Sequence, residues 1–147
     1  MRGLSVTTVA WDGTTLAGDK RAVWGDSIPV EATKVFRVKH KKEVYLIGFS
    51  GLTAVGEAFV RHLRKKGLVG HPPGVKGSTI WVITRRGGLI LSDDDPRSEH
   101  NEEKWAIGSG WHFALGAMYS GKTAEQAVEI ASRLDIYTGG GVDAVRF

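Results

Sequence analysis

The chain has 147 residues, a formal net charge of +4 and no cysteine. This length fits one domain that can bury a core without cross-links or metals, and the lack of cysteine excludes disulfides, thiolate metal sites and cysteine catalysis. No apolar run is long enough to span a bilayer, and the first residues lack the apolar segment of a secretory signal. We therefore expect a cytoplasmic protein.

The first expected elements are two strands joined by a tight turn. Residues 7–11 are β-prone, Asp12-Gly13 follows, and residues 14–18 are β-prone again, which is a strong hairpin pattern. Residues 20–33 contain glycine and proline, and they are interpreted as a loop with some extended structure.

A second pair of strands is expected to lead into the first helix. Residues 34–38 alternate polar and apolar, as a half-buried strand does, and residues 44–49 are strongly apolar. Apolar residues recur at helical spacing over residues 52–65. The glycines and prolines of residues 66–77 indicate a loop.

The next expected hairpin has its turn at Gly87-Gly88, between strands at residues 79–84 and 89–91. The acidic stretch 93–103 is interpreted as a solvated loop, and a short strand is expected over residues 105–107.

Two helices and a last strand complete the expected order. Residues 110–119, rich in alanine, glycine and aromatic residues, indicate a buried helix. Thr123 and Gln126 form a capping-box pattern that opens a helix to about Leu134. A triple glycine then precedes a strand over residues 142–147. Segregated strands and helices favour an α+β fold.

Five separated segments resemble one known family. They are the Thr-Thr pair at residues 7–8 with its hairpin to Asp19, the strand opening at Lys34, and residues 47–51, 106–110 and 134–140. In this order and spacing they resemble the proteasome β-subunit and HslV family of N-terminal nucleophile hydrolases, as a short bacterial or phage-type homologue. The resemblance implies a four-layer αββα sandwich over residues 7–147. Loop 66–77 would replace the family's second helix.

The resemblance implies that Thr7 is the nucleophile and that its own α-amine is the base. An α-amine has a pKa of about 7.7–8.0, so a useful fraction is neutral near pH 7. Lys34 would stabilise the alkoxide, and Asp19 would hold Lys34 in place. The bland alternative is that Asp19 and Lys34 form a buried salt bridge without a catalytic role.

Further site residues follow from the same resemblance. Gly48 would donate its backbone N–H to the oxyanion, although it could be a simple turn glycine. Ser109, Asp135 and Thr138 would complete a network around the α-amine, with helix capping as the alternative for Ser109.

A specificity pocket is also implied, selecting a small-to-medium apolar side chain. Its expected lining residues are Ala22, Ala32, Leu46 and Ser50. We predict no metal site and no cofactor: the five histidines lack metal-ligand spacing. Family members often hold a cation on turn carbonyls, which here would be those of Ser132, Asp135 and Thr138, but we do not predict one.

The α-amine can act only if Thr7 is the first residue, because a peptide nitrogen is not a base. Residues 1–6 are therefore expected to be a propeptide or a mis-assigned start. In the family the propeptide usually ends in glycine, whereas here Val6 precedes Thr7. A GTG start codon at position 6 would explain the difference.

The function that follows is a threonine-type endopeptidase subunit of a self-compartmentalising assembly, a homo-oligomeric ring or stack. Peptides or unfolded proteins would be its substrates, and an ATPase unfoldase is a candidate partner. We expect no membrane partner, and no nucleic acid, because no aromatic residues alternate with the basic clusters as base-stacking platforms would. The alternatives are a catalytically inactive assembly protein and a small-molecule amidase on the same fold.

Overall fold

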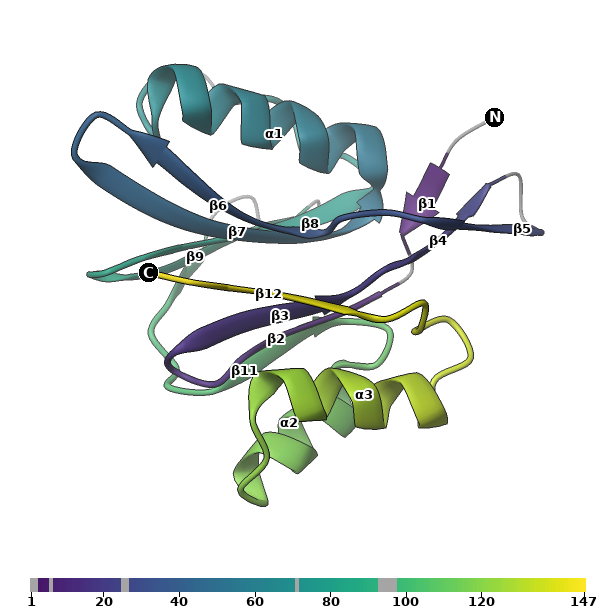
Figure 1. Ribbon diagram of the computed structural model, residues 1–147. Coiled ribbons are helices and arrows are strands. Elements are labelled where there is room, and N and C mark those ends of the chain that lie inside the picture. The colour runs from purple at the N-terminus through teal and green to yellow at the C-terminus, as the bar shows by residue number, and fades with distance from the viewer. Residues whose placement is uncertain (1–2, 6, 25–26, 71, 93–97) are drawn as a thin grey trace.

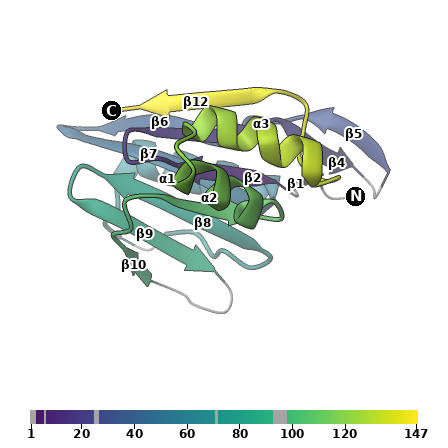
Figure 2. The same ribbon diagram turned by 90° about the horizontal axis from the view of Figure 1, so that it is seen from below.

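The computed structural model describes residues 3–5, 7–24, 27–70, 72–92 and 98–147. These residues form four layers, helix on sheet on sheet on helix (Figure 1). Helix α1 covers the outer face of the larger sheet, and helices α2 and α3 cover the outer face of the smaller one (Figures 1 and 2). The expected α+β fold, a four-layer αββα sandwich, is confirmed.

The smaller sheet holds the hairpin that was expected from Asp12-Gly13. Its order is β11-β2-β3-β12, all antiparallel, and its strands are β2 (Thr8–Trp11), β3 (Thr15–Asp19), β11 (Trp105–Gly108) and β12 (Val142–Arg146). The Asp12 carboxylate accepts hydrogen bonds from the backbone N–H groups of Thr14 and Thr15, at 2.9 and 2.8 Å. This Asx-type bonding closes the turn and explains why the local pattern was sufficient to predict it.

The larger sheet has the order β10-β9-β8-β7-β1-β4-β5, and β6 also pairs with β7. Its strands are β1 (Gly3–Ser5), β4 (Arg21–Trp24), β5 (Ile28–Glu31), β6 (Val35–His40), β7 (Glu43–Leu52), β8 (Ser78–Thr84), β9 (Gly87–Ser92) and β10 (Ser98–His100). The long strand β7 pairs with β6 over Glu43–Gly48 and with β1 at Gly51 and Leu52. Strand β1 therefore continues where β6 stops, and it bridges β7 to β4.

The three helices are α1 (Thr53–Lys66), α2 (Trp111–Tyr119) and α3 (Ala124–Leu134). Helix α3 begins with the expected capping box: the Thr123 hydroxyl accepts from the Gln126 N–H at 3.2 Å, and the Gln126 side chain accepts from the Thr123 N–H at 3.0 Å. Between α1 and β8 the described residues contain no helix, in agreement with the loop expected over residues 66–77.

The two outer interfaces are packed with side chains of different size. Large apolar residues such as Phe49, Phe59 and Leu63 fill the space between α1 and its sheet. Under α2 and α3 the buried residues are mostly alanines. Between the sheets, Val9, Leu16, Val35, Leu46 and Trp81 form a third apolar cluster that backs the candidate site.

Several local expectations were wrong. The region 20–33 contains two paired strands, β4 and β5, rather than mainly loop, and residues 25–26 between them lie outside the described residues. The acidic stretch includes strand β10, and residues 93–97 of that stretch also lie outside the described residues. The turn between β8 and β9 lies at Arg85-Arg86, two residues before the glycine pair. Helix α2 is not buried all round, because Trp111 and Tyr119 are 45% and 64% exposed.

In the part of the chain that the structure describes, every helix is too short or too polar to cross a membrane.

Candidate active site

Three polar side chains meet beside the first residue of β2. Thr7 precedes β2, Asp19 ends β3, and Lys34 precedes β6, so three separate strand ends bring them together. All three residues are 0% exposed. Buried charges are tolerated in proteins only when they are paired and hydrogen-bonded, so each contact of this cluster matters.

The Lys34 ammonium uses all three of its N–H bonds. It donates to the Thr7 hydroxyl oxygen at 2.7 Å, to Asp19 Oδ1 at 2.9 Å and to the backbone carbonyl of Arg21. Three donors with three acceptors satisfy a protonated lysine completely. The ammonium therefore lies directly on the hydroxyl oxygen whose negative charge it could stabilise.

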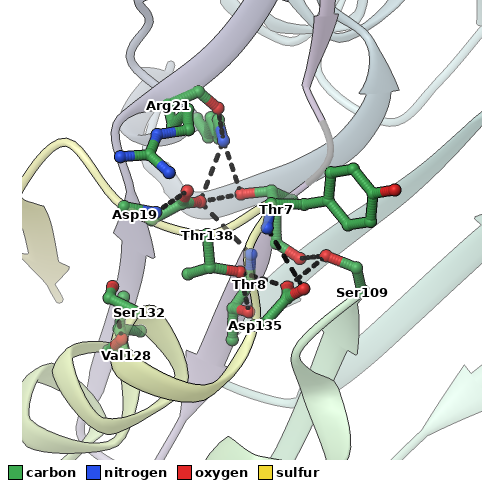
Figure 3. Close-up of polar contacts among 12 residues, drawn as sticks. Thr7, Thr8, Asp19, Arg21, Ser109, Val128, Ser132, Asp135 and Thr138 are labelled. Atoms are coloured by element: carbon green, nitrogen blue, oxygen red, sulfur yellow. Dashed lines mark hydrogen bonds and ion pairs between the residues drawn. The ribbon is translucent and has the colours of Figure 1, made fainter. Parts of the chain in front are cut away.

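The Asp19 carboxylate joins the other partners. Its Oδ1 atom accepts from the Thr7 hydroxyl and, at 3.2 Å, from the Thr8 N–H, while Oδ2 accepts from the Gly139 N–H at 2.9 Å. With the Lys34 contact, both oxygens are occupied and the carboxylate has little freedom to turn. Figure 3 shows Thr7 between Asp19 on one side and Ser109 and Asp135 on the other.

Burial lowers the pKa of the Lys34 ammonium, because removal from water disfavours its charged form, and the nearby Asp19 carboxylate opposes this shift. The Arg21 guanidinium lowers the pKa further by a smaller amount. The two buried charges of the cluster thus depend on each other.

A second cluster lies on the other side of Thr7. The Ser109 hydroxyl lies 2.5 Å from Asp135 Oδ2 and 3.3 Å from the Thr7 carbonyl oxygen, so its single proton is directed mainly to Asp135. The Thr138 hydroxyl also donates to Asp135 Oδ2, at 2.5 Å. Thr8 closes the cluster through a 2.9 Å hydrogen bond between its hydroxyl and that of Thr138. The structure thus brings Ser109, Asp135 and Thr138 together, and their role around the α-amine of Thr7 stays a prediction.

The Asp135 carboxylate is only partly buried. Its desolvation raises the pKa, but hydrogen bonds from Ser109, Thr138 and the Tyr137 backbone outweigh this effect, and the pKa of Asp135 falls below its usual value. Asp135 is therefore held as the charged acceptor of this cluster.

Two glycines allow the segment around Ser109 to lie close to Thr7 and Thr8. Gly108 has a φ of +96°, and a side chain there would collide with the carbonyl of Thr7. A Cβ at Gly110 would collide with the Thr8 hydroxyl and lie 3.3 Å from Asp135 Oδ2. The Gly-Ser-Gly sequence thus positions Ser109 through the two glycines that flank it.

Gly48 lies within β7, opposite Val35 of β6 and Trp81 of β8. A Cβ there would point between the sheets, 2.6 Å from Val9 Cγ1, which explains the glycine by packing alone. The next residue, Phe49, donates its N–H to the Lys34 carbonyl at 3.1 Å. The role of Gly48 as an oxyanion donor stays a prediction.

Two of the four expected pocket residues line a cavity beside Lys34. Ala22 and Ala32 are among its walls. Leu46 is 0% exposed in the cluster between the sheets, and Ser50 is half-buried on β7 opposite Thr79, and neither lines that cavity.

Three contributors were missed as site residues. Thr8 bonds both clusters, through its N–H to Asp19 and its hydroxyl to Thr138, and the Arg21 carbonyl accepts from Lys34. Gly139 donates to Asp19 from the far end of the chain. The second threonine of the Thr-Thr pair was the available signal for Thr8, whereas backbone groups leave no signal in side-chain identity.

Among the described residues, no three histidine, aspartate or glutamate side chains gather as metal ligands would. The Ser132 hydroxyl, near the suggested carbonyl positions, donates to the Val128 carbonyl at 2.8 Å within α3.

The chain is similar to known proteins in sequence and in fold. No protein-family model matches the chain. The chain is 28% identical over 179 residues to proteasome subunit beta 1 of Thermococcus onnurineus, covering 96% of this chain and 86% of that protein.

Several solved structures share the fold. Eukaryotic HslV from Trypanosoma brucei superimposes with a TM-score of 0.64 at 18% identity, over 95% of this chain and 97% of HslV. The helical assembly of the Anbu complex from Pseudomonas aeruginosa gives 0.69 at 11% identity, over 96% and 80%. The chain therefore has the fold of proteasome β-subunits and HslV, and its sequence resembles that family along almost its whole length.

Proposed function

We propose that this chain is the subunit of a proteasome-like threonine endopeptidase, with Thr7 as nucleophile after residues 1–6 are lost. The observation that carries the proposal is the buried contact of the Thr7 hydroxyl with both the Lys34 ammonium and the Asp19 carboxylate. A purely structural ion pair would not need a nucleophilic hydroxyl between its partners. Perturbed buried groups around a nucleophile are typical of catalytic sites.

In the proposed first step, the Thr7 hydroxyl oxygen forms a bond to the carbonyl carbon of the substrate. Its proton passes to the α-amine of Thr7, and the Lys34 ammonium stabilises the developing alkoxide at 2.7 Å. Positive charge held at this oxygen before the reaction begins lowers the barrier without reorganisation of solvent.

The tetrahedral intermediate then collapses. The peptide C–N bond breaks, the leaving amine takes the proton from the α-ammonium, and the acyl group remains on the Thr7 oxygen as an ester. Water, activated by the same α-amine, hydrolyses the ester and restores the free threonine. The second cluster would position this amine, because Ser109 contacts the carbonyl of the same residue at 3.3 Å.

Strand β1 indicates where a peptide substrate would lie. Leu4 pairs with Val23 of β4 and with Leu52 of β7, so three residues of extended chain fill a slot between two strands, immediately before the nucleophile. Loss of residues 1–6 would leave backbone groups of both strands free. An extended peptide can replace β1 there through main-chain hydrogen bonds.

A homo-oligomeric ring or stack would enclose these sites. The Anbu structure is a helical assembly and the β-subunit relative is by name a proteasome subunit, which supports an assembly of copies of this chain. Peptides and unfolded proteins are the proposed substrates, delivered by an ATPase unfoldase where one is present.

The test is the intact mass of the purified full-length chain before and after treatment with a β-lactone that acylates N-terminal threonine. We expect a mass that starts at Thr7 and gains one adduct. Thr7→Ala should abolish the adduct. Thr14→Ala, a matched change in the exposed hairpin turn, should retain it. A chain that keeps residue 6 and gains no adduct would contradict the proposal.

That outcome would favour a catalytically inactive assembly protein on the same fold. One observation supports this second candidate. In the unprocessed chain β1 pairs with β4 on one side and with β7 on the other, so these residues before Thr7 are held in the larger sheet. The endopeptidase and the inactive assembly protein are therefore distinguished by whether the peptide bond between residues 6 and 7 is cleaved.

A further inference from the structure

A cavity of about 540 Å³ is lined in part by chain neighbours of the residues that contact the proposed nucleophile. Thr33, one of its lining residues, directly precedes Lys34, and Ala22, another, directly follows Arg21. Lys34 and the Arg21 carbonyl are bonded to each other, and Lys34 contacts the Thr7 hydroxyl. A side chain on the residue that acylates Thr7 would therefore have this cavity within reach.

Six of the ten residues that line the cavity are apolar. Ala22, Val30 and Phe36 present only hydrocarbon, and the half-exposed Trp24 flanks them. Walls of this kind cover the methylene stem of a long side chain as well as they cover a branched aliphatic one. Apolar character alone thus leaves the choice of side chain open.

The charge of the cavity distinguishes a branched aliphatic substrate side chain from a long cationic one. Two carboxylates, Glu31 and Glu57, line the cavity, and its described lining contains neither lysine nor arginine. Glu31 has Lys20 as a partner at 3.4 Å, whereas Glu57 forms no ion pair within the described residues. The cavity is therefore an acidic one, with Glu57 as its uncompensated charge.

A hydroxyl adds a further acceptor. The Thr53 Oγ1 atom, at the start of α1, is buried and has no hydrogen-bond partner within the described part of the chain, and Thr53 lines the cavity. A hydroxyl oxygen has two lone pairs that can accept hydrogen bonds. An ammonium or guanidinium group supplies donors for such an acceptor and a countercharge for Glu57.

We infer that the enzyme cleaves after lysine or arginine, whose cationic end is recognised by Glu57 and Thr53 while the stem packs on the apolar walls. The inference rests on the proposed peptidase function and revises the expectation of a small-to-medium apolar side chain. Glu57 is the specificity-determining residue.

The test uses the full-length chain as it accumulates in cells, with active sites counted by the β-lactone adduct. Three fluorogenic peptides that differ only in arginine, leucine or glutamate before the cleaved bond are compared by kcat/KM. We expect arginine to exceed leucine by about fivefold or more, because an exposed ion pair contributes up to about that factor and partial burial by the bound peptide increases it. This preference should shrink as salt is added, since salt screens exposed charges.

Two variants locate the effect. Glu57→Gln should bring arginine down to the level of leucine, and Glu57→Lys should favour the glutamate peptide over the arginine peptide. Glu129→Gln, the same change at an exposed position on α3, should leave the preference intact. The number of β-lactone adducts should be equal in all of them.

The outcomes separate the two proposals. An adduct on Thr7 together with equal or higher cleavage after leucine would overturn the inference and leave the proposed function standing. An arginine preference that survives Glu57→Lys would also overturn it. No adduct and no cleavage of any peptide would overturn the proposed function and the inference with it.

Discussion

The two hydrogen-bonded clusters on either side of Thr7 are built from similar groups but in different surroundings. Asp19 and Lys34 are fully buried and neutralise each other. Asp135 is partly solvated and is held by two hydroxyls and a backbone N–H. The first cluster can stabilise charge on the nucleophile strongly because water is absent, and for the same reason it tolerates no loss of a partner.

The largest effect is expected from Asp19→Asn. This change leaves the Lys34 ammonium buried without a countercharge, and it should lower the free energy of unfolding by about 3–5 kcal/mol. Urea denaturation at pH 7 measures it. In the double variant Asp19→Asn/Lys34→Met most of this stability should return, whereas reaction with the β-lactone should not. If the free energy of unfolding of Asp19→Asn were within about 1 kcal/mol of that of the parent, the buried cluster would be no more sensitive to loss of a partner than the partly solvated one.

The Asp19→Asn variant should also show a distinctive dependence on pH. Burial lowers the pKa of Lys34, and the variant lacks the carboxylate that opposes this shift. The unfolded chain, with a lysine pKa near 10.5, then binds a proton that the folded chain has released. Stability should therefore rise with pH in that window, by up to about 1.4 kcal/mol per pH unit. A flat profile up to pH 10 would contradict the assignment.

A smaller loss is expected from Asp135→Asn in the second cluster. Its carboxylate loses charge-assisted hydrogen bonds at the edge of the protein, and we expect about 1–2 kcal/mol in the same denaturation experiment. A loss as large as that of Asp19→Asn would mean that solvent does not moderate this cluster.

Asp135 also predicts part of the acid response. Desolvation raises its pKa, but the hydrogen bonds from Ser109 and Thr138 outweigh that effect, so the folded-state pKa lies below the unfolded value of 3.8. The stability that this carboxylate contributes is present above about pH 3.8 and is lost as pH falls through the folded pKa. Denaturation midpoints of the parent should fall in this range by more than those of Asp135→Asn.

The smallest effect is expected from Ser109→Ala. It removes one charge-assisted hydrogen bond to Asp135 and a longer contact with the Thr7 carbonyl. Asp135 keeps the donors of Thr138 and the Tyr137 backbone and is partly solvated, so the expected loss is about 0.5–1.5 kcal/mol. Ser120→Ala is the matched control: within the described part of the chain that exposed hydroxyl bonds the Gly116 carbonyl of α2, and its loss should cost less. If reaction of Thr7 with the β-lactone slows only in Ser109→Ala, Ser109 positions the nucleophile.

Local signals in the sequence predicted those elements that are stabilised by neighbouring residues. The Asp12-Gly13 turn depends on hydrogen bonds that span three residues, and the start of α3 depends on the Thr123 and Gln126 pair. Helix α1 was visible because its buried residues recur at helical spacing. Each of these features needs no knowledge of the rest of the chain.

Elements stabilised by distant partners were missed or misjudged. The hairpin β4–β5 carries exposed apolar residues such as Ile28, and its place depends on the pairing of β4 with β1. Strand β10 forms in an acidic stretch because β9 offers it an edge. Helix α2 was expected to be buried on all sides because its composition is apolar. Composition does not show which side has neighbours, and Trp111 and Tyr119 are exposed.

By itself, the sequence determined the α+β class, the order of its main elements and the residue types of the candidate site. Turns and caps depend on residues close together in the chain, and the resemblance depends on five short segments in a fixed order and spacing. Only the tertiary structure decided that Thr8, the Arg21 carbonyl and the Gly139 N–H bond the residues around Thr7, and that Glu57 charges the neighbouring cavity. These groups lie on strand ends, a helix and the loop between α3 and β12, and Thr7 and Gly139 are 132 residues apart. Their meeting follows from how two sheets pack, which no short stretch of sequence contains.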